Sequence, residues 1–178
     1  AEGATVVIAA RRKMELDSIA NQIKKSGGNG LSAPTDLTEE AQVLSLFQLI
    51  QQMYSRLDIL VNSVGGFGSA PIEDLPVEVW NRVIDSNLNA PFLCIREALK
   101  IMKKHRNGRI INIGSTSAKR IRPNSAAYSA AKHGLWGLTQ VTALEGRSFG
   151  ITCCCVHPGR VGVERAPSNP DGLNDPVI

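Results

Sequence analysis

Two residues in the C-terminal half of the sequence have types and spacing suited to proton transfer. In the run Tyr128-Ser129-Ala130-Ala131-Lys132, the phenol and the ammonium group are four positions apart. In an α-helix this spacing makes the two side chains neighbours on one face. A cation beside a phenol stabilises the phenolate, so Tyr128 could give a proton to a carbonyl oxygen and take one back from an alcohol. An exposed helix pair with no chemistry would have the same spacing.

A serine in the preceding segment favours the chemical interpretation. Ser115 lies 13 residues before Tyr128 and directly follows the apolar run at residues 109–114, which predicts a strand. Its hydroxyl could hold the same carbonyl oxygen that the tyrosine protonates.

The elements that must position these residues alternate between strands and helices. Short apolar runs predict strands at residues 5–9, 31–34, 57–61, 109–114 and 151–156. Apolar residues at helical spacing predict helices at residues 12–25, 38–54, 76–87, 90–106 and 126–149, the second entered by a Thr-Glu-Glu start. This alternation predicts one α/β domain over residues 1–178, a Rossmann-like doubly wound parallel sheet between two helical layers.

In such sheets ligands bind beyond the carboxyl ends of the strands. The segments that follow the predicted strands are Arg11-Arg12, Asp36-Leu37, residues 62–68, residues 115–117 and residues 158–161.

At these positions the sequence resembles the classical short-chain dehydrogenase/reductase family, whose catalytic serine precedes a Tyr-x-x-x-Lys motif at this interval. The resemblance implies that Ser115, Tyr128 and Lys132 are catalytic. It also implies that Asn87 completes the set by kinking its helix and holding a water in a proton relay toward the lysine. Helix C-capping is a second role for Asn87, compatible with the first.

The resemblance further implies a nicotinamide cofactor. Residues 62–65 look like the family's Asn-Asn-Ala-Gly signature, although Ser63 and Val64 depart from it. Residues 158–161 resemble the Pro-Gly motif that meets the carboxamide, although Val163 stands where the family usually has threonine. The expected cofactor contacts are Asp36, Leu37, Asn62, Gly65, Tyr128, Lys132, Pro158, Gly159 and Val161.

The end of the strand at residues 5–9 bears on which cofactor is used. An acidic residue there would bind a free ribose 2′-hydroxyl, but this sequence has Ala10 followed by Arg11 and Arg12. Guanidinium groups suit a 2′-phosphate, so NADP is favoured over NAD. The alternative is that the arginines only begin a solvated helix.

The family pattern begins before this sequence and continues after it. Residues 1–11 correspond to the tail of the first helix and the second strand, so the first strand and its glycine-rich phosphate loop are missing. Residues 163–178 begin the loop that closes over the substrate. We therefore expect the activity in an intact parent protein, with a pocket lined by Gly66, Phe67, Gly68, Ser117 and Ala118 and a substrate whose identity stays open.

Composition favours a cytoplasmic enzyme without a metal. The four cysteines lack zinc-ligand spacing, and the basic residues behind the net charge of +4 are scattered, which argues against nucleic acid. The apolar runs fall far short of the ~20 residues that span a bilayer. His133 and His157 adjoin motif residues, but nothing pairs them with a nucleophile or metal, so both are predicted to be structural.

Two other functions stay open. An epimerase or dehydratase would share the tyrosine and lysine, although Asn87 and residues 62–65 argue against it. A catalytically silent nucleotide sensor or scaffold would keep the fold and bind nucleotide without turnover. By resemblance, the helices at residues 90–106 and 126–149 would also pack against a second subunit in a homodimer or homotetramer.

Overall fold

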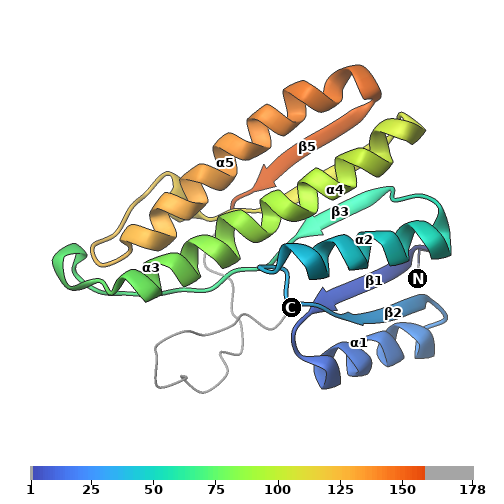
Figure 1. Ribbon diagram of the computed structural model, residues 1–178, viewed down its shortest axis with the longest axis horizontal. Helices are drawn as coiled ribbons and strands as arrows, with labels where there is room; N and C mark the ends of the chain where they lie inside the picture. Colours follow the sequence, from blue (N-terminus) through green and yellow to red (C-terminus); the bar gives the residue numbers. More distant parts are fainter. Residues whose placement is uncertain (1, 159–178) are drawn as a thin grey trace. The chain divides into compact units, whose positions relative to one another are not determined.

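The computed structural model describes residues 2–158. The chain divides into two compact units, with the boundary between Ser55 and Arg56. The first unit contains β1 (Thr5–Ala10), α1 (Lys13–Lys25), β2 (Asn29–Pro34) and α2 (Glu40–Tyr54), drawn in blue and cyan in Figure 1. β1 and β2 are parallel, with Thr5 opposite Asn29. α1 packs on both strands, and a Cβ at Gly30 would lie 3.0 Å from the Ala20 carbonyl oxygen, so this helix and strand approach closely.

The helix predicted over residues 38–54 begins two residues later than expected, at Glu40. The side chain of Asp36 explains the shift, because its Oδ1 accepts hydrogen bonds from the Thr38 N–H at 3.0 Å and the Thr38 hydroxyl at 2.7 Å. Thr38 therefore closes a turn after β2 and does not cap the helix.

The second unit holds a parallel sheet of three strands. These are β3 (Ile59–Asn62), β4 (Gly108–Ile113) and β5 (Ile151–Val156), in the order β3-β4-β5. Its helices are α3 (Val77–Ile84), α4 (Ala90–His105) and α5 (Ala126–Gly146), with single turns of 3-10 helix at Ile72–Asp74, Thr116–Ala118 and Arg147–Phe149. The predicted Rossmann-like α/β class is confirmed, with strands and helices close to their expected positions.

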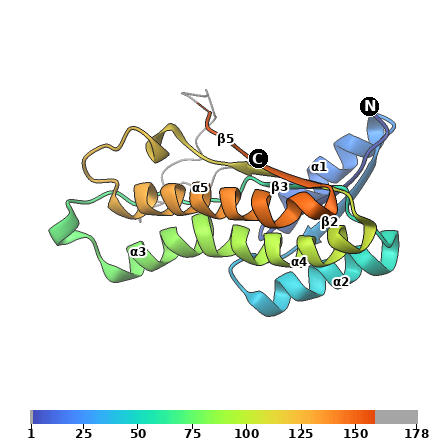
Figure 2. The same cartoon turned by 90° about the horizontal axis from the view of Figure 1, so that it is seen from above.

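α4 and α5 lie side by side along one face of this sheet (Figure 2). Their inward faces carry small and branched apolar residues, which allow close packing on the strands. The buried core between these helices and the sheet includes Ala98, Ile101, Met102, Ile110, Ala131 and Leu135. This packing fixes the position of α5, which carries the predicted tyrosine and lysine.

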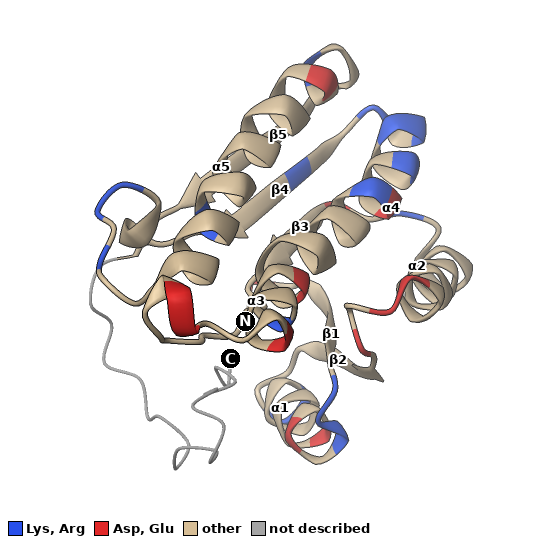
Figure 3. Ribbon diagram, turned by 60° about the vertical axis from the view of Figure 1, so that its left-hand side comes forward, with Lys and Arg blue, Asp and Glu red and all other residues tan. Residues whose placement is uncertain are grey.

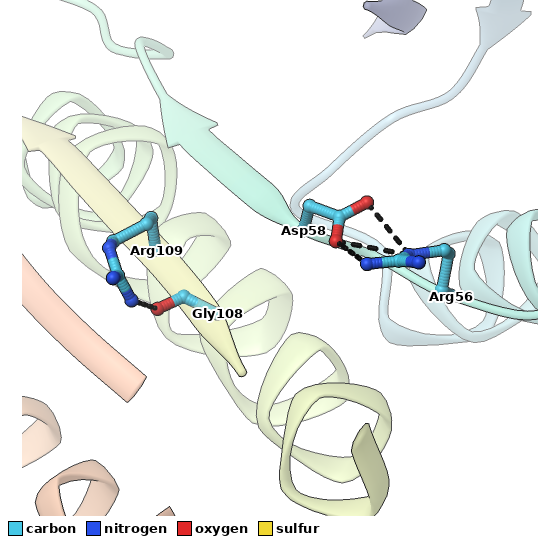
Figure 4. Close-up of polar contacts among 4 residues, drawn as sticks. All are labelled: Arg56, Asp58, Gly108 and Arg109. Atoms are coloured by element: carbon cyan, nitrogen blue, oxygen red, sulfur yellow. Dashed lines mark hydrogen bonds and ion pairs between the residues drawn. The ribbon is translucent and has the colours of Figure 1, made fainter. Parts of the chain in front are cut away.

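The amino ends of the strands in this unit carry charged residues near the surface. Lys103 and Lys104 lie in the last turn of α4, where basic residues gather in Figure 3. Just before β3, the Arg56 guanidinium pairs with the Asp58 carboxylate at 2.6 Å, while Arg109 of β4 donates to the Gly108 carbonyl oxygen at 2.8 Å (Figure 4). Within residues 2–158, no helix is both long and apolar enough to cross a membrane.

Candidate active site

The predicted catalytic residues of the second unit gather at the carboxyl ends of its strands. Ser115 follows β4, and Tyr128 and Lys132 lie in the first two turns of α5, which packs on β5 and on the 3-10 turn after Ser115. Asn87 lies in a segment that α5 also contacts. The topology therefore brings together residues up to 45 positions apart in the sequence.

Lys132 is nearly buried, with 4% of its surface exposed. Its Nζ donates a hydrogen bond to the Ile113 carbonyl oxygen at 2.9 Å and lies 5.5 Å from the centroid of the Tyr128 ring. Burial lowers the pKa of Lys132 to about 8, although the nearby Cys155 thiol acts in the opposite direction. An ammonium group with this pKa can release and regain a proton close to neutral pH.

The half-buried Tyr128 is held from a second side by Phe67. Their ring centroids are 5.3 Å apart with an interplanar angle of 68°, an edge-to-face contact. The contact brings Phe67, from the segment that follows β3, to the predicted acid/base residue. Phe67 was expected to line the substrate pocket, and this contact places it beside the tyrosine.

Ser115 has its hydroxyl oriented by the turn that follows it. The residue is extended, with φ −160° and ψ 154°, and its Oγ accepts a hydrogen bond from the Ser117 N–H at 3.1 Å. Because the oxygen accepts in this contact, the O–H stays able to donate to an oxygen of a bound substrate.

Asn87 lies in a π-helical segment, Asp85–Asn89, that runs on from α3 into α4. The suggestion of a helix C-cap is therefore wrong, because the helical backbone continues past Asn87. The side chain is fully buried, and its Nδ2 donates to the Gly66 carbonyl oxygen at 2.7 Å and to the Val83 carbonyl oxygen at 3.0 Å. Its Oδ1 is buried with no hydrogen-bond partner among the described residues, which marks a place for a polar ligand or water.

Gly65 is required for this arrangement. A Cβ at that position would lie 2.5 Å from the Asn87 Oδ1, closer than real Cβ atoms approach a neighbour. The expected Asn62 has a different setting, because its Nδ2 donates to the Asn112 Oδ1 at 2.8 Å, and Asn112 in turn donates to the Thr139 hydroxyl at 2.8 Å. Sequence reasoning missed this buried chain, although a polar residue within an apolar strand is the signal that marks Asn112.

Four of the predicted cofactor contacts, Arg11, Arg12, Asp36 and Leu37, belong to the first unit and are described within it. Asp36 follows β2, and although burial would raise its pKa, hydrogen bonds from Thr38 and the charge of Arg11 hold that pKa below its ordinary value. Arg12 precedes α1, where its guanidinium lies 3.5 Å from the Glu15 carboxylate, and Leu37 is half-buried. Both arginines remain partly exposed at the carboxyl end of β1.

The predicted carboxamide motif is only partly described. Pro158 is the last described residue, and Gly159, Arg160, Val161 and Val163 lie outside the described residues, as does the whole of the predicted substrate loop. Within residues 2–158, no group of three or more His, Cys, Asp or Glu side chains could hold a metal ion.

Comparison with known proteins shows which family the chain belongs to. The sequence profile described as short chain dehydrogenase matches residues 1–172, nearly the whole chain. The chain belongs to the short-chain dehydrogenase family. The prediction made from Ser115, Tyr128 and Lys132 is thereby confirmed at the level of the family.

Several members of the family are similar over most of this chain. An uncharacterised oxidoreductase of Bacillus subtilis, YxjF, is 40% identical over 92% of this chain and 63% of its own length. A 3beta-hydroxysteroid dehydrogenase of Mediterraneibacter gnavus is 38% identical, over 88% of the chain and 57% of the relative. A D-beta-hydroxybutyrate dehydrogenase of Rhizobium meliloti is 41% identical, over 76% of the chain and 53% of the relative. The chain therefore spans less than two thirds of the length of these relatives.

Solved structures of the same family superpose closely. A short chain dehydrogenase from Mycobacterium smegmatis has a TM-score of 0.85 at 31% identity, with 89% of this chain and 67% of the other covered. A xylitol dehydrogenase in its NAD+-bound form has a TM-score of 0.88 at 26% identity, over 91% of this chain and 63% of the other.

Proposed function

We propose that this chain carries the catalytic residues of an NADP-dependent oxidoreductase that interconverts a ketone or aldehyde and an alcohol. The observation that carries the proposal is the buried Lys132 ammonium, 5.5 Å from the Tyr128 ring and hydrogen-bonded two residues before Ser115. Membership of the short-chain dehydrogenase family supports the reaction class.

The described residues supply the proton chemistry. In the reducing direction, the Ser115 hydroxyl donates a hydrogen bond to the substrate's carbonyl oxygen, and Tyr128 transfers its phenolic proton to the same oxygen. The Lys132 ammonium stabilises the phenolate that is left and can return a proton to it. The Asn87 Oδ1, which lacks a described partner, would hold a water that connects Lys132 with solvent.

The residues present fit a nicotinamide cofactor, which when bound would supply the hydride to the carbonyl carbon or accept it from the alcohol. Gly65 leaves open the space that a Cβ would fill beside Asn87. Lys132 would hold the nicotinamide ribose as well as assist Tyr128, as the family resemblance implies. Pro158 and Gly159 would meet the carboxamide, and Asp36, Leu37 and Asn62 the adenosine half, as the family resemblance implies.

Preference for NADP is supported by the two arginines after β1. Arg11 and Arg12 keep exposed surface, and no acidic residue occupies the last position of that strand, Ala10. Two cations there favour a 2′-phosphate. We expect Arg11→Gln with Arg12→Gln to raise the KM for NADPH about 10-fold or more, the size of a lost charge-assisted contact, and to leave the KM for NADH nearly unchanged. Equal effects on both cofactors would contradict the preference.

The proposal predicts turnover that depends on Tyr128. The protein would be prepared at the full length of its relatives, and oxidation of NADPH followed by absorbance with ketosteroids, sugars and short β-keto acids, classes that the relatives' names suggest. We expect turnover with at least one class and its loss in Tyr128→Phe, which keeps the ring contact with Phe67 but removes the proton. Nucleotide binding without turnover would replace the proposal by a sensor or scaffold.

We also propose that the protein forms a homodimer or homotetramer through α4 and α5. Apolar side chains on these helices stay exposed in the single chain, among them Phe92, Val141 and Leu144. Sedimentation of the full-length protein tests this, and a monomer at micromolar concentration would contradict it.

A further inference from the structure

His157 lies where the pairing of β4 with β5 ends. The Gly114 N–H donates to the Val156 carbonyl oxygen at 2.8 Å, and this is the last backbone bond between the two strands in the described chain. In a parallel ladder the next bond would come from the N–H of residue 158. That residue is Pro158, which has no N–H to donate to the Gly114 carbonyl oxygen, so the backbone ladder ends at Gly114, one residue before Ser115.

Beyond this last backbone bond, the imidazole of His157 provides a contact between the two segments. Its Nδ1 lies 2.8 Å from the Ser115 carbonyl oxygen and 3.3 Å from the Ser115 backbone nitrogen. One ring nitrogen cannot donate to the carbonyl and accept from the N–H at the same time, so the tautomer selects one of the two bonds. In either tautomer the ring is tied to the backbone of the residue that carries the predicted substrate-binding hydroxyl.

The surroundings hold the imidazole in this place. The ring meets Trp136 of α5 edge to face, with centroids 6.5 Å apart and an interplanar angle of 83°, and Lys119 lies over the same indole at 5.9 Å. A Cβ at Gly114 would lie 2.7 Å from the His157 Nδ1, so the glycine admits the ring.

We infer that His157 is a positioning residue for the reaction, acting through Ser115. The hydroxyl of Ser115 is fixed by its own backbone and by the Ser117 N–H, and His157 fixes that backbone where β4 has ended. The inference rests on the proposed function of Ser115. It adds a role to a residue that the sequence alone predicted to be structural.

Two variants at His157 distinguish the effect of its hydrogen bond to Ser115 from the effect of its side-chain size. His157→Asn keeps an amide that can donate to the Ser115 carbonyl or accept from its N–H, whereas His157→Leu has a similar size and neither ability. In the full-length protein we expect His157→Leu to lower kcat about 10- to 100-fold, the effect of a misplaced reacting group, with the cofactor KM unchanged. We expect His157→Asn to restore kcat to within about threefold of the wild type, because the lost bond returns.

Two controls keep the result interpretable. His133→Leu removes an imidazole of α5 whose Nδ1 contacts the Ser129 carbonyl oxygen of its own helix, and it should leave kcat unchanged. If His157→Leu does not fold, His157→Gln takes its place, since its amide lies one carbon too far out. An unchanged kcat in whichever of the two is used would overturn the inference.

The double variant with Ser115→Ala decides whether His157 acts through that serine. Once the hydroxyl is gone, His157→Leu should cost no further activity, because residues that act as a unit are not additive. A full additional loss in the double variant would overturn the positioning role while leaving the proposed function intact. An undiminished turnover in Ser115→Ala alone would instead remove the proposed role of Ser115, and the inference with it.

Discussion

The polar side chains considered at the amino end of the sheet β3-β4-β5 are exposed, whereas those at its carboxyl end are buried. At the amino end the charges stay in water: the side chains of Arg56 and Asp58 are 61% and 50% exposed and pair with each other. At the carboxyl end Lys132 is 4% exposed and Asn87 fully buried. A salt bridge in water contributes little to stability, whereas a buried cation or amide costs free energy unless it is fully satisfied.

This difference supports the carboxyl end of the sheet as the proposed active site. Nothing in the packing of the described residues requires a lysine at position 132, since its Nζ bonds one carbonyl oxygen and burial lowers its pKa. The Oδ1 of Asn87 is left without a described partner. Polar groups that are retained at a cost, and incompletely paired, are typical of functional sites.

The largest effect should follow the loss of the buried cation. Lys132→Met keeps a chain of similar length without the charge, so the phenolate of Tyr128 loses its stabilising neighbour. We expect kcat to fall about 10²- to 10⁴-fold, the usual contribution of acid/base assistance. A fall of similar size in the matched exposed variant Lys119→Met would show that α5 and its neighbours are merely sensitive to charge, and would contradict the comparison.

The same substitution should change the dependence of stability on pH. The pKa of Lys132 is about 8 in the folded protein and 10.5 ordinarily, so folding favours the neutral amine. Below pH 8, burial of the charged Lys132 lowers the free energy of unfolding by its full amount. This loss is relieved as the pH rises toward 10.5, by up to about 3 kcal/mol. The free energy of unfolding of the wild type should therefore rise over this window relative to Lys132→Met.

Denaturant titrations of both proteins between these pH values measure the difference directly. The thiols of the buried Cys94 and the half-buried Cys153, each with a pKa that burial raises to about 12, are present in both proteins, so their contributions cancel. Cys155 interacts with the Lys132 charge, so the pair is also compared in a Cys155→Ser background. A difference that stays constant with pH would mean that Lys132 is not buried as described.

A smaller effect is expected from a single methyl group at the carboxyl end. In Gly65→Ala the new Cβ would lie 2.5 Å from the Asn87 Oδ1, so one of the two must move. We expect kcat to fall about 10-fold or more because the water proposed at Oδ1 would be displaced. Gly137→Ala is the matched control, since a Cβ there meets nothing within 4 Å and should stabilise α5 without changing kcat.

The sequence predicted those parts of the molecule that follow general rules of secondary structure. Strand and helix alternation gave the α/β class, and β5 begins and ends at the predicted residues 151 and 156. At the candidate site, helical spacing predicted that Tyr128 and Lys132 would be neighbours, and the Lys132 Nζ lies 5.5 Å from the centroid of the Tyr128 ring. Their catalytic roles stay predictions. The contacts of His157 and Asn112 were not, because each depends on strand register, which brings Ser115 beside His157 and Asn62 beside Asn112. The π segment at Asn87 was missed because helical spacing alone cannot show one extra residue in a turn.

We expect the smallest effect from a substitution at the amino end of the sheet. Removing the charge in Arg56→Gln breaks the pair with Asp58, but both side chains remain solvated, so the free energy of unfolding should change by about 1 kcal/mol or less. The change should shrink further as salt is added, because screening already weakens the pair. A double-mutant cycle with Asp58→Asn measures the coupling of the two residues, and kcat should be unchanged throughout. A coupling of several kcal/mol, or a loss of turnover, would mean that the amino end of the sheet also contributes to stability or activity. The exposed fraction of a charged side chain would then not be enough to separate structural from functional charges in this sheet.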